Sequence, residues 1–276
     1  MITGGACLTC RRRPCQAIPG LTRYGKEKDV GGMTILRSAR VPAVLGLTVA
    51  GMLAVPLAAP ASATTSHCLI INAAADTSYS SLQAAQNAAS PGATLAVRGT
   101  CTGATEITKS LTLTGQHPAG FTAPTLSGGG QGSTLTIIGV AGAPTVTINT
   151  LTITGGTAGD GAGIFSAGFV TLNDSSITGN TARSNGGGIY AAEFTLTLND
   201  TSITGNTAGL LGGGILNAGD LVTLNGSSSI TGNIAGRGGG GIFSGGGVAR
   251  TVGVTATNVT GNTPDNCDGT VPGCVG

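Results

Sequence analysis

The chain has 276 residues, a formal net charge of +2 and 50 glycines. Eight of its 13 lysine and arginine residues, but only two of its 11 acidic residues, lie in residues 1–63. Residues 64–276 therefore carry five basic and nine acidic side chains, a net charge of −4. This balance leaves no basic stripe, so we expect no nucleic-acid partner.

The first 63 residues have the pattern of a leader. Arg37 and Arg40 precede an apolar run, Val41–Ala63, that ends in Ala-Ser-Ala. This order of charged, apolar and small residues is typical of a secretory signal peptide, and the prolines within the run favour cleavage over a membrane anchor. We expect a signal peptide at 33–63 and no membrane span after its removal. Residues 1–32 are either an N-terminal extension or a start codon placed too early, so Met1 and Met33 both stay open as the start.

The mature chain is expected to begin with a cap and a first coil over 64–104. Ser80 and Gln83 form the pattern of a capping box at the start of a short helix that ends before Pro91. Leu82, Ala85 and Ala89 share one face of this helix. Because the terminal unit of a stacked repeat must cover an open apolar end, we expect the helix to close the N-terminal end of the fold.

A repeat of 26 or 27 residues dominates the rest of the chain, over 105–263. The tetrad Ile-Thr-Gly-Asn begins at Ile177, Ile203 and Ile230 and returns as Val259-Thr-Gly-Asn; between these copies, Gly-Gly-Gly-Ile begins at Gly186, Gly212 and Gly239. A fixed period of this length is typical of a stacked repeat protein. Short alternating segments rich in Thr and Ile, separated by Gly and Asn, predict three short strands and turns in each unit.

Three short strands in one repeat close one coil of a solenoid. Parallel crossovers are almost always right-handed, so we predict an all-β, right-handed parallel β-helix of about seven coils with a short N-terminal capping helix. Stacked coils place equivalent residues about 4.8 Å apart. We therefore expect two ladders of asparagine amides: Asn173, Asn199 and Asn225, and Asn180, Asn206, Asn233 and Asn262.

The cysteines of the mature chain lie in pairs at its two ends. Cys68 and Cys101 flank the cap, and Cys267 and Cys274 lie in the C-terminal tail, 264–276. Because disulfides form in exported proteins, we predict the bridges 68–101 and 267–274. Their expected role is structural.

Candidate catalytic residues are few. Asp174 and Asp200 occupy the same position of successive repeats, where stacking would bring two carboxylates together as a Ca²⁺ site or an acid/base pair. Arg183 is the candidate base of a uronate lyase. The competing interpretation is that both aspartates are turn residues and the arginine is a solvated charge, and we favour it because Gly226 ends the acidic row. Apart from Ca²⁺ in the lyase alternative, we expect no cofactor or metal.

Hydroxyl side chains form a more regular pattern. They flank the inward Ile or Val in five predicted coils. The pairs are Thr152 and Thr154, Ser176 and Thr178, Ser202 and Thr204, and Ser229 and Thr231; in the fifth coil Asn258 replaces the first hydroxyl residue and Thr260 is the second. Such a row is explained by β-propensity and by hydroxyls bonding up the stack, or by a flat surface that binds a lattice such as ice. The neighbouring positions 145, 169, 195 and 221 do not continue it, because they hold Thr, Phe, Thr and Leu.

Together, the Gly-Gly-Gly-Ile motif and the Ile-x-x-Asn motif resemble the repeat of polymorphic outer-membrane proteins and related bacterial β-helix proteins. Those proteins carry Gly-Gly-Ala-Ile and Phe-x-x-Asn, where this chain has Gly188 and Gly214 in place of the Ala and Ile177, Ile203 and Ile230 in place of the Phe. The resemblance is strong over about 161–263 and implies a pectin-lyase-like fold. It implies no activity, because that fold hosts many functions.

Three functional hypotheses follow. The first is a secreted, non-enzymatic β-helix, extracellular or attached to a bacterial cell wall, that adheres to an unidentified glycan or protein through its repetitive surface. The second is a polysaccharide-active enzyme, using Asp174, Asp200 and Arg183. The third is an ice-binding protein, using the hydroxyl rows.

Overall fold

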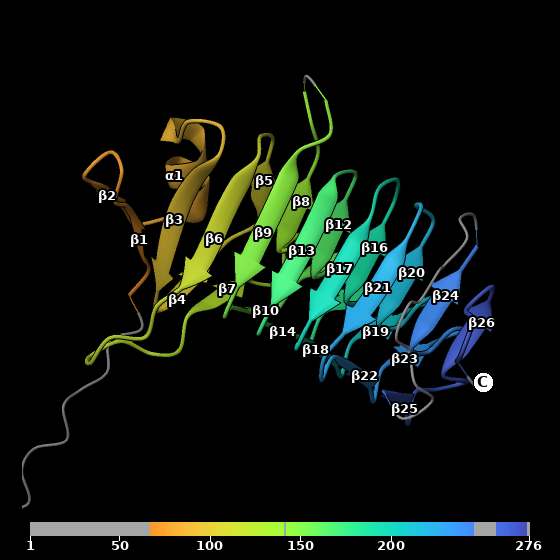
Figure 1. The fold of residues 1–276 in the computed structure, drawn as a ribbon. Helices are drawn as coiled ribbons and strands as arrows, with labels where there is room; N and C mark the ends of the chain where they lie inside the picture. Colours follow the sequence, from red (N-terminus) through yellow and green to blue (C-terminus); the bar gives the residue numbers. More distant parts are fainter. Residues whose placement is uncertain (1–66, 141, 246–257, 275–276) are drawn as a thin grey trace, which may run out of the picture. The chain divides into compact units, whose positions relative to one another are not determined.

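The computed structural model describes residues 67–140, 142–245 and 258–274, which belong to one compact unit. The predicted extension 1–32 and signal peptide 33–63 lie outside the described residues. Within them, the chain forms a parallel β-solenoid of about six turns with one short helix (Figure 1). The predicted fold class is confirmed. Six coils carry strands in three long sheets, and β25 and β26 add part of a seventh, close to the seven predicted.

Each coil passes through the sheets in a fixed order. Sheet 1 contains β2 (Thr77–Tyr79), β1 (Leu69–Asn72), β3 (Ala93–Arg98), β6 (Leu111–Gly115), β9 (Thr145–Asn149), β13 (Phe169–Asn173), β17 (Leu196–Asn199) and β21 (Val222–Asn225). Sheet 2 contains β4 (Thr100–Thr102), β7 (Thr125–Ser127), β10 (Thr152–Thr154), β14 (Ser176–Thr178), β18 (Ser202–Thr204), β22 (Ser229–Thr231) and β25 (Val259–Thr260).

The chain then turns through a short sheet into a third long one. Sheet 3 contains β11 (Thr157–Ala158), β15 (Thr181–Ala182), β19 (Thr207–Ala208) and β23 (Ile234–Ala235). Sheet 4 contains β5 (Thr105–Ile107), β8 (Leu135–Ile137), β12 (Ile164–Ser166), β16 (Ile189–Ala191), β20 (Ile215–Asn217), β24 (Ile242–Ser244) and β26 (Cys267–Gly269). The predicted disulfide tail thus contributes the last strand of sheet 4.

The core is a stack of identical inward side chains. In sheet 2, Ile177 lies between two outward hydroxyl residues and pairs in register with Ile153 and Ile203. All three are fully buried. Burying an isoleucine side chain contributes about 1.5–3 kcal/mol, so each coil stabilises its neighbours through the same position.

The triple-glycine motif is needed where the backbone turns into sheet 4. Gly186 has φ +62°, a conformation that favours glycine. A Cβ on Gly188 would lie 2.6 Å from the carbonyl oxygen of Gly214 in the next coil. The turns therefore stack with backbone against backbone, and the alanine of the resembled family does not fit at Gly188.

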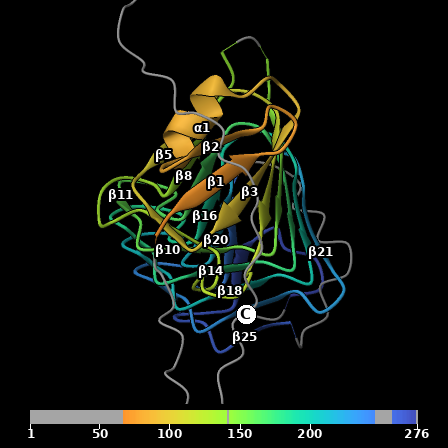
Figure 2. The same cartoon turned by 90° about the vertical axis from the view of Figure 1, so that its left-hand side faces the viewer.

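The predicted cap helix is α1 (Leu82–Ala88), which lies at the N-terminal end of the solenoid beside β1, β2 and β5 (Figures 1 and 2). The predicted capping pair is wrong by one residue, because the N-cap is Ser81, whose Oγ accepts from the N–H of Ala84 at 3.3 Å. Gln83 instead accepts from the N–H of Glu106 at 2.8 Å and donates to its carbonyl oxygen at 3.3 Å. Gln83 thus joins the helix to the first coil.

Both predicted disulfides are confirmed. Cys68 bonds to Cys101 with a Cα–Cα distance of 4.5 Å, which ties the start of the cap to β4. Cys267 bonds to Cys274 with a Cα–Cα distance of 6.1 Å and closes the C-terminal turn. Among the residues described, no helix has the length and apolarity to span a membrane.

Candidate functional site

The outward surface of sheet 2, which we call the hydroxyl face, carries two in-register rows of side chains. The first row is Thr100, Thr125, Thr152, Ser176, Ser202 and Ser229. The second row is Thr102, Ser127, Thr154, Thr178, Thr204, Thr231 and Thr260. Every member is at least partly exposed. The predicted rows are therefore confirmed and extend two coils further towards the N-terminus than the sequence repeat indicated.

Most of these hydroxyls have no hydrogen-bond partner in the described part of the chain. Within the first row, Ser202 donates to Ser176 at 3.2 Å, as the stacking explanation requires. In the second row, by contrast, the hydroxyls of Thr154, Thr178, Thr204, Thr231 and Thr260 make no hydrogen bond to any residue within 67–140, 142–245 and 258–274. Mutual hydrogen bonding therefore does not account for this row, and its hydroxyls are available to a ligand.

Sheet 1 presents a second ordered surface. Its outward positions include an unbroken threonine row: Thr94, Thr112, Thr147, Thr171, Thr197 and Thr223. The row that the sequence showed to be irregular lies two residues away, where Phe169 pairs with Thr145. Hydroxyl rows thus cover two adjacent sheets.

The first predicted asparagine ladder borders this threonine row. Asn225 donates to Asn199 at 2.7 Å, Asn199 to Asn173 at 2.6 Å, and Asn173 to Asn149 at 2.7 Å. Asn149 then donates to Thr114 at 3.2 Å. These amides are partly exposed, and their direction is the same in every coil.

Asp174 and Asp200 lie at the corner between sheets 1 and 2. Their φ angles are +47° and +48°, and the equivalent residues Thr150 and Gly226 have +53° and +62°. Aspartate tolerates this left-handed conformation better than most residues, which explains its presence at this corner. The geometry therefore agrees with the turn interpretation of both aspartates.

The Asp200 carboxylate accepts two hydrogen bonds from a residue of the next coil. Its Oδ1 accepts from the backbone N–H of Ser227 at 2.8 Å and from the Ser227 hydroxyl at 2.9 Å. These two bonds lower the pKa of Asp200 below its ordinary value. Asp174, Asp200, Ser176 and Ser202 line a shallow groove of about 470 Å³ along this corner.

The structure does not bring Arg183 to the aspartates. Arg183 follows β15 in the turn towards sheet 4, so strands β14 and β15 separate it from Asp174. Among the described residues, no three His, Cys, Asp or Glu side chains form a group that would hold a metal ion. The arrangement that calcium-assisted uronate elimination needs is not assembled from these three residues.

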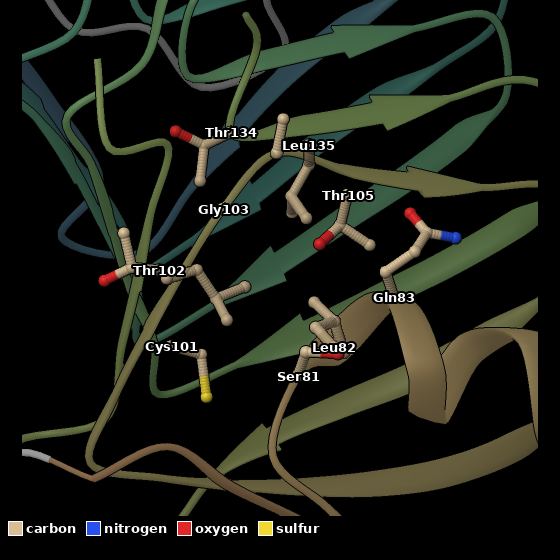
Figure 3. Close-up of a pocket in the computed structure, with 11 residues that line it drawn as sticks. Ser81, Leu82, Gln83, Cys101, Thr102, Gly103, Thr105, Thr134 and Leu135 are labelled. Atoms are coloured by element: carbon tan, nitrogen blue, oxygen red, sulfur yellow. The ribbon is translucent and has the colours of Figure 1, made fainter. Parts of the chain in front are cut away.

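A small cavity of about 110 Å³ lies between α1 and the first two coils (Figure 3). Its walls include Ser81, Gln83, Thr105, Leu135 and Cys101. The Cys101 sulfur is in the disulfide, and no titratable side chain lines the cavity. It is best understood as a packing space under the cap.

A row of large side chains on sheet 4 was not predicted from the sequence. The outward position of sheet 4 holds Phe165, Tyr190, Leu216 and Phe243 in four successive coils. Each of these large residues directly follows the isoleucine of a glycine-rich turn, and this position could have predicted the row. The residue type at that position varies between repeats, so only the isoleucine was recognised as part of the motif.

The chain was compared with protein-family models, with curated proteins and with solved structures. None of them matches. The fold is therefore established by the structure of this chain alone, and its function must be argued from the surfaces described above.

Proposed function

We propose that the mature protein is a secreted, non-enzymatic β-solenoid that adheres to a repetitive extracellular or cell-wall surface through its hydroxyl face. The observation that carries the proposal is the row of five threonine hydroxyls, from Thr154 to Thr260, that have no hydrogen-bond partner among the described residues. Hydroxyls of the second row on neighbouring strands are about 4.8 Å apart. The first row lies two residues away, about 6.6 Å along each strand. A regular ligand can meet both rows at once.

Two further features support export and the family resemblance. The disulfides Cys68–Cys101 and Cys267–Cys274 suit an oxidising compartment. The predicted signal peptide would direct the chain to such a compartment. The stacked Gly-Gly-Gly-Ile turns and asparagine ladders are what a relative of the polymorphic outer-membrane-protein repeats would have, so we include that relationship in the proposal.

Binding to isolated cell walls and to a glycan array tests the function. We expect the wild-type protein to bind at least one surface component and a Thr178→Val/Thr204→Val variant to lose about tenfold or more in affinity, the effect of two lost hydrogen bonds. Valine keeps the shape and β-propensity of threonine. The matched control, Thr171→Val/Thr197→Val, removes the same groups from sheet 1. Absence of wild-type binding, or equal loss in both variants, would overturn the proposal.

Ice is a second candidate ligand. It is favoured by the length of the two in-register rows: the second row has a hydroxyl on all seven strands of sheet 2, and the first row has one on six of them. An ice-binding protein inhibits recrystallisation and separates the melting and freezing temperatures of its solution. Both effects should disappear in Thr204→Tyr, whose side chain would stand out from the flat face. Normal ice growth in the presence of the wild-type protein would rule out this candidate.

A further inference from the structure

The outward row of sheet 4 differs in chemistry from the rows of sheets 1 and 2. Read along the pairing, it is Glu106, Thr136, Phe165, Tyr190, Leu216, Phe243 and Asp268. The four central side chains, which we call the aromatic stripe, lie on β12, β16, β20 and β24, neighbouring strands along the solenoid (Figure 1). Three of the seven aromatic residues of the described chain therefore share one line.

The rings of the stripe are ordered. Phe165 and Tyr190 are stacked, with their centroids 5.3 Å apart and an angle of 9° between their planes. The two rings lie on neighbouring strands of sheet 4 in a near-parallel arrangement, which favours aromatic contact between them. Phe165, Tyr190 and Phe243 are all partly exposed, whereas Leu216 is 6% exposed.

Glycines of the turns pack against the side chains of the stripe. A Cβ on Gly186 would lie 2.9 Å from the Cβ of Tyr190, and a Cβ on Gly239 would lie 2.6 Å from that of Phe243. In these coils, glycine backbone therefore lies directly against the Cβ atoms of the aromatic residues. No side chain from these turn positions screens the rings.

Charge and hydrogen bonding restrict the ligand. The stripe itself is uncharged, and the outward row ends in carboxylates, Glu106 and Asp268, with no basic side chain in the row. An anionic polymer would be repelled at both ends. In the described residues, the Tyr190 hydroxyl makes no hydrogen bond. The surface thus offers ring faces and a free hydroxyl to a ligand that is neutral and amphipathic.

We propose that the aromatic stripe binds a neutral polysaccharide chain that runs along the solenoid axis. Its sugar rings would place their C–H faces on Phe165, Tyr190 and Phe243, and a sugar hydroxyl would bond the Tyr190 hydroxyl. A polymer of sugar rings repeats along one direction, as does the stripe, whose positions follow the strand spacing of about 4.8 Å. The inference names a ligand class within the proposed adhesive function, but it rests on a different sheet.

Affinity electrophoresis and calorimetry with mixed-linkage β-glucan, galactomannan and dextran test the proposal, with polygalacturonate as the anionic comparison. The key variant is Phe165→Leu/Tyr190→Leu. Leucine occupies the equivalent position at Leu216, so the variant should fold. We expect binding of at least one neutral polymer by the wild type, and about tenfold or more weaker binding by this variant, since each aromatic contact contributes about 0.5–1.5 kcal/mol.

One further variant sharpens the test. Tyr190→Phe removes only the hydroxyl and should weaken binding by a smaller factor than the double variant. The stripe proposal is overturned by wild-type protein that binds none of the three neutral polymers, by unchanged binding in the double leucine variant, by stronger binding of polygalacturonate, or by evidence from light scattering that the stripe joins two copies of the chain.

The hydroxyl-face variant Thr178→Val/Thr204→Val separates this inference from the function proposed above. If the hydroxyl-face variant alone loses binding to cell walls and polymers, the adhesive function stands and the aromatic stripe is not the binding site. If only the stripe variants lose binding, the polysaccharide site is on sheet 4 and the hydroxyl face is not required.

Discussion

Asn206 and Asn233, 27 residues apart in sequence, are joined by two hydrogen bonds to one oxygen atom. The Oδ1 of Asn233 accepts from the backbone N–H of Asn206 at 2.9 Å and from its Nδ2 at 3.0 Å. Asn180 makes the same pair of bonds to Asn206. Both asparagines are fully buried. At the C-terminal end, Asn262 donates to Asn266 at 3.2 Å from the same two atoms, which ends the ladder.

The buried ladder predicts a large loss of stability when one member is removed. Asn206→Ala would leave the backbone N–H of Asn180 without its acceptor in a buried corner, and it would remove the bonds that Asn206 Nδ2 donates to the carbonyl oxygens of Ile177 and Thr204. An unsatisfied buried polar group costs about 1–3 kcal/mol, so we expect the free energy of unfolding to fall by about 3 kcal/mol or more. Urea denaturation measures this change.

The exposed ladder supplies the control for this prediction. Asn199→Ala removes an amide that also bonds its neighbours but is partly exposed, so water can replace the lost partner. We expect it to cost about 1 kcal/mol. Equal effects of the two substitutions would show that burial of the corner ladder is not what makes it stabilising.

The stacked glycine turns predict that alanine is poorly tolerated at Gly214. An added Cβ would lie 2.6 Å from the carbonyl oxygen of Gly241 and 2.8 Å from Cγ2 of Ile230. Overpacking of this kind costs about 1–3 kcal/mol, which a thermal melt would detect. Gly159→Ala is the matched control, because nothing lies within 4 Å of its added Cβ. A melting temperature of Gly214→Ala equal to that of the control would contradict the prediction.

The two disulfides are expected to contribute unequally to stability. The bridge Cys68–Cys101 closes a separation of 33 residues and the bridge Cys267–Cys274 one of 7. Loop-closure entropy predicts contributions of about 4 and about 2 kcal/mol, respectively. Chemical denaturation of the two paired Cys→Ser variants measures both values. A larger loss on removal of the C-terminal bridge would mean that local unfolding of that end, and not loop length, controls the effect.

The bonds from Ser227 to Asp200 predict a specific dependence on pH. The pKa of Asp200 is lowered in the folded protein, first by the backbone N–H and then by the hydroxyl of Ser227. The stabilising contribution of this carboxylate is therefore present above the unfolded pKa of about 3.9 and is lost as the pH falls through the lower folded pKa.

Ser227→Ala should raise the pKa of Asp200 part of the way towards its ordinary value, because the bond from the backbone N–H stays. An NMR titration of the Asp200 carboxyl carbon measures the shift. Ser176→Ala, which leaves both bonds intact, is the control and should not move the pKa. A pKa that is unchanged in Ser227→Ala would show that the hydroxyl bond is not formed in solution.

Much of this structure was predictable because its information is local and repeated. The position of Ile177 between Ser176 and Thr178 specifies an inward side chain and two outward ones, and the constant period places the same residues on the next coil. Periodicity therefore predicted the strands, both asparagine ladders and the hydroxyl rows of the later coils. The disulfides were predictable for a related reason, since the cysteines occur in pairs at opposite ends of a stack.

Only the tertiary structure decided the features that depend on a neighbour outside the pattern. Ser81 rather than Ser80 caps α1, and Gln83, the expected partner of Ser80, bonds Glu106 of the first coil instead. The irregular segment between β6 and β7 hid the continuation of the hydroxyl rows to Thr100 and Thr125, because the residue spacing there no longer follows the period.

Sequence determined which residues point outward, but not which of them are left without a partner or come together. The Asp200 carboxylate bonds Ser227, while the Thr204 hydroxyl bonds no described residue, although both are polar residues at repeated positions. The aromatic stripe joins residues separated by about one repeat along the chain. Hydrogen bonds and ring contacts depend on distances of a few tenths of an ångström between coils, and these are set only when the whole stack is packed.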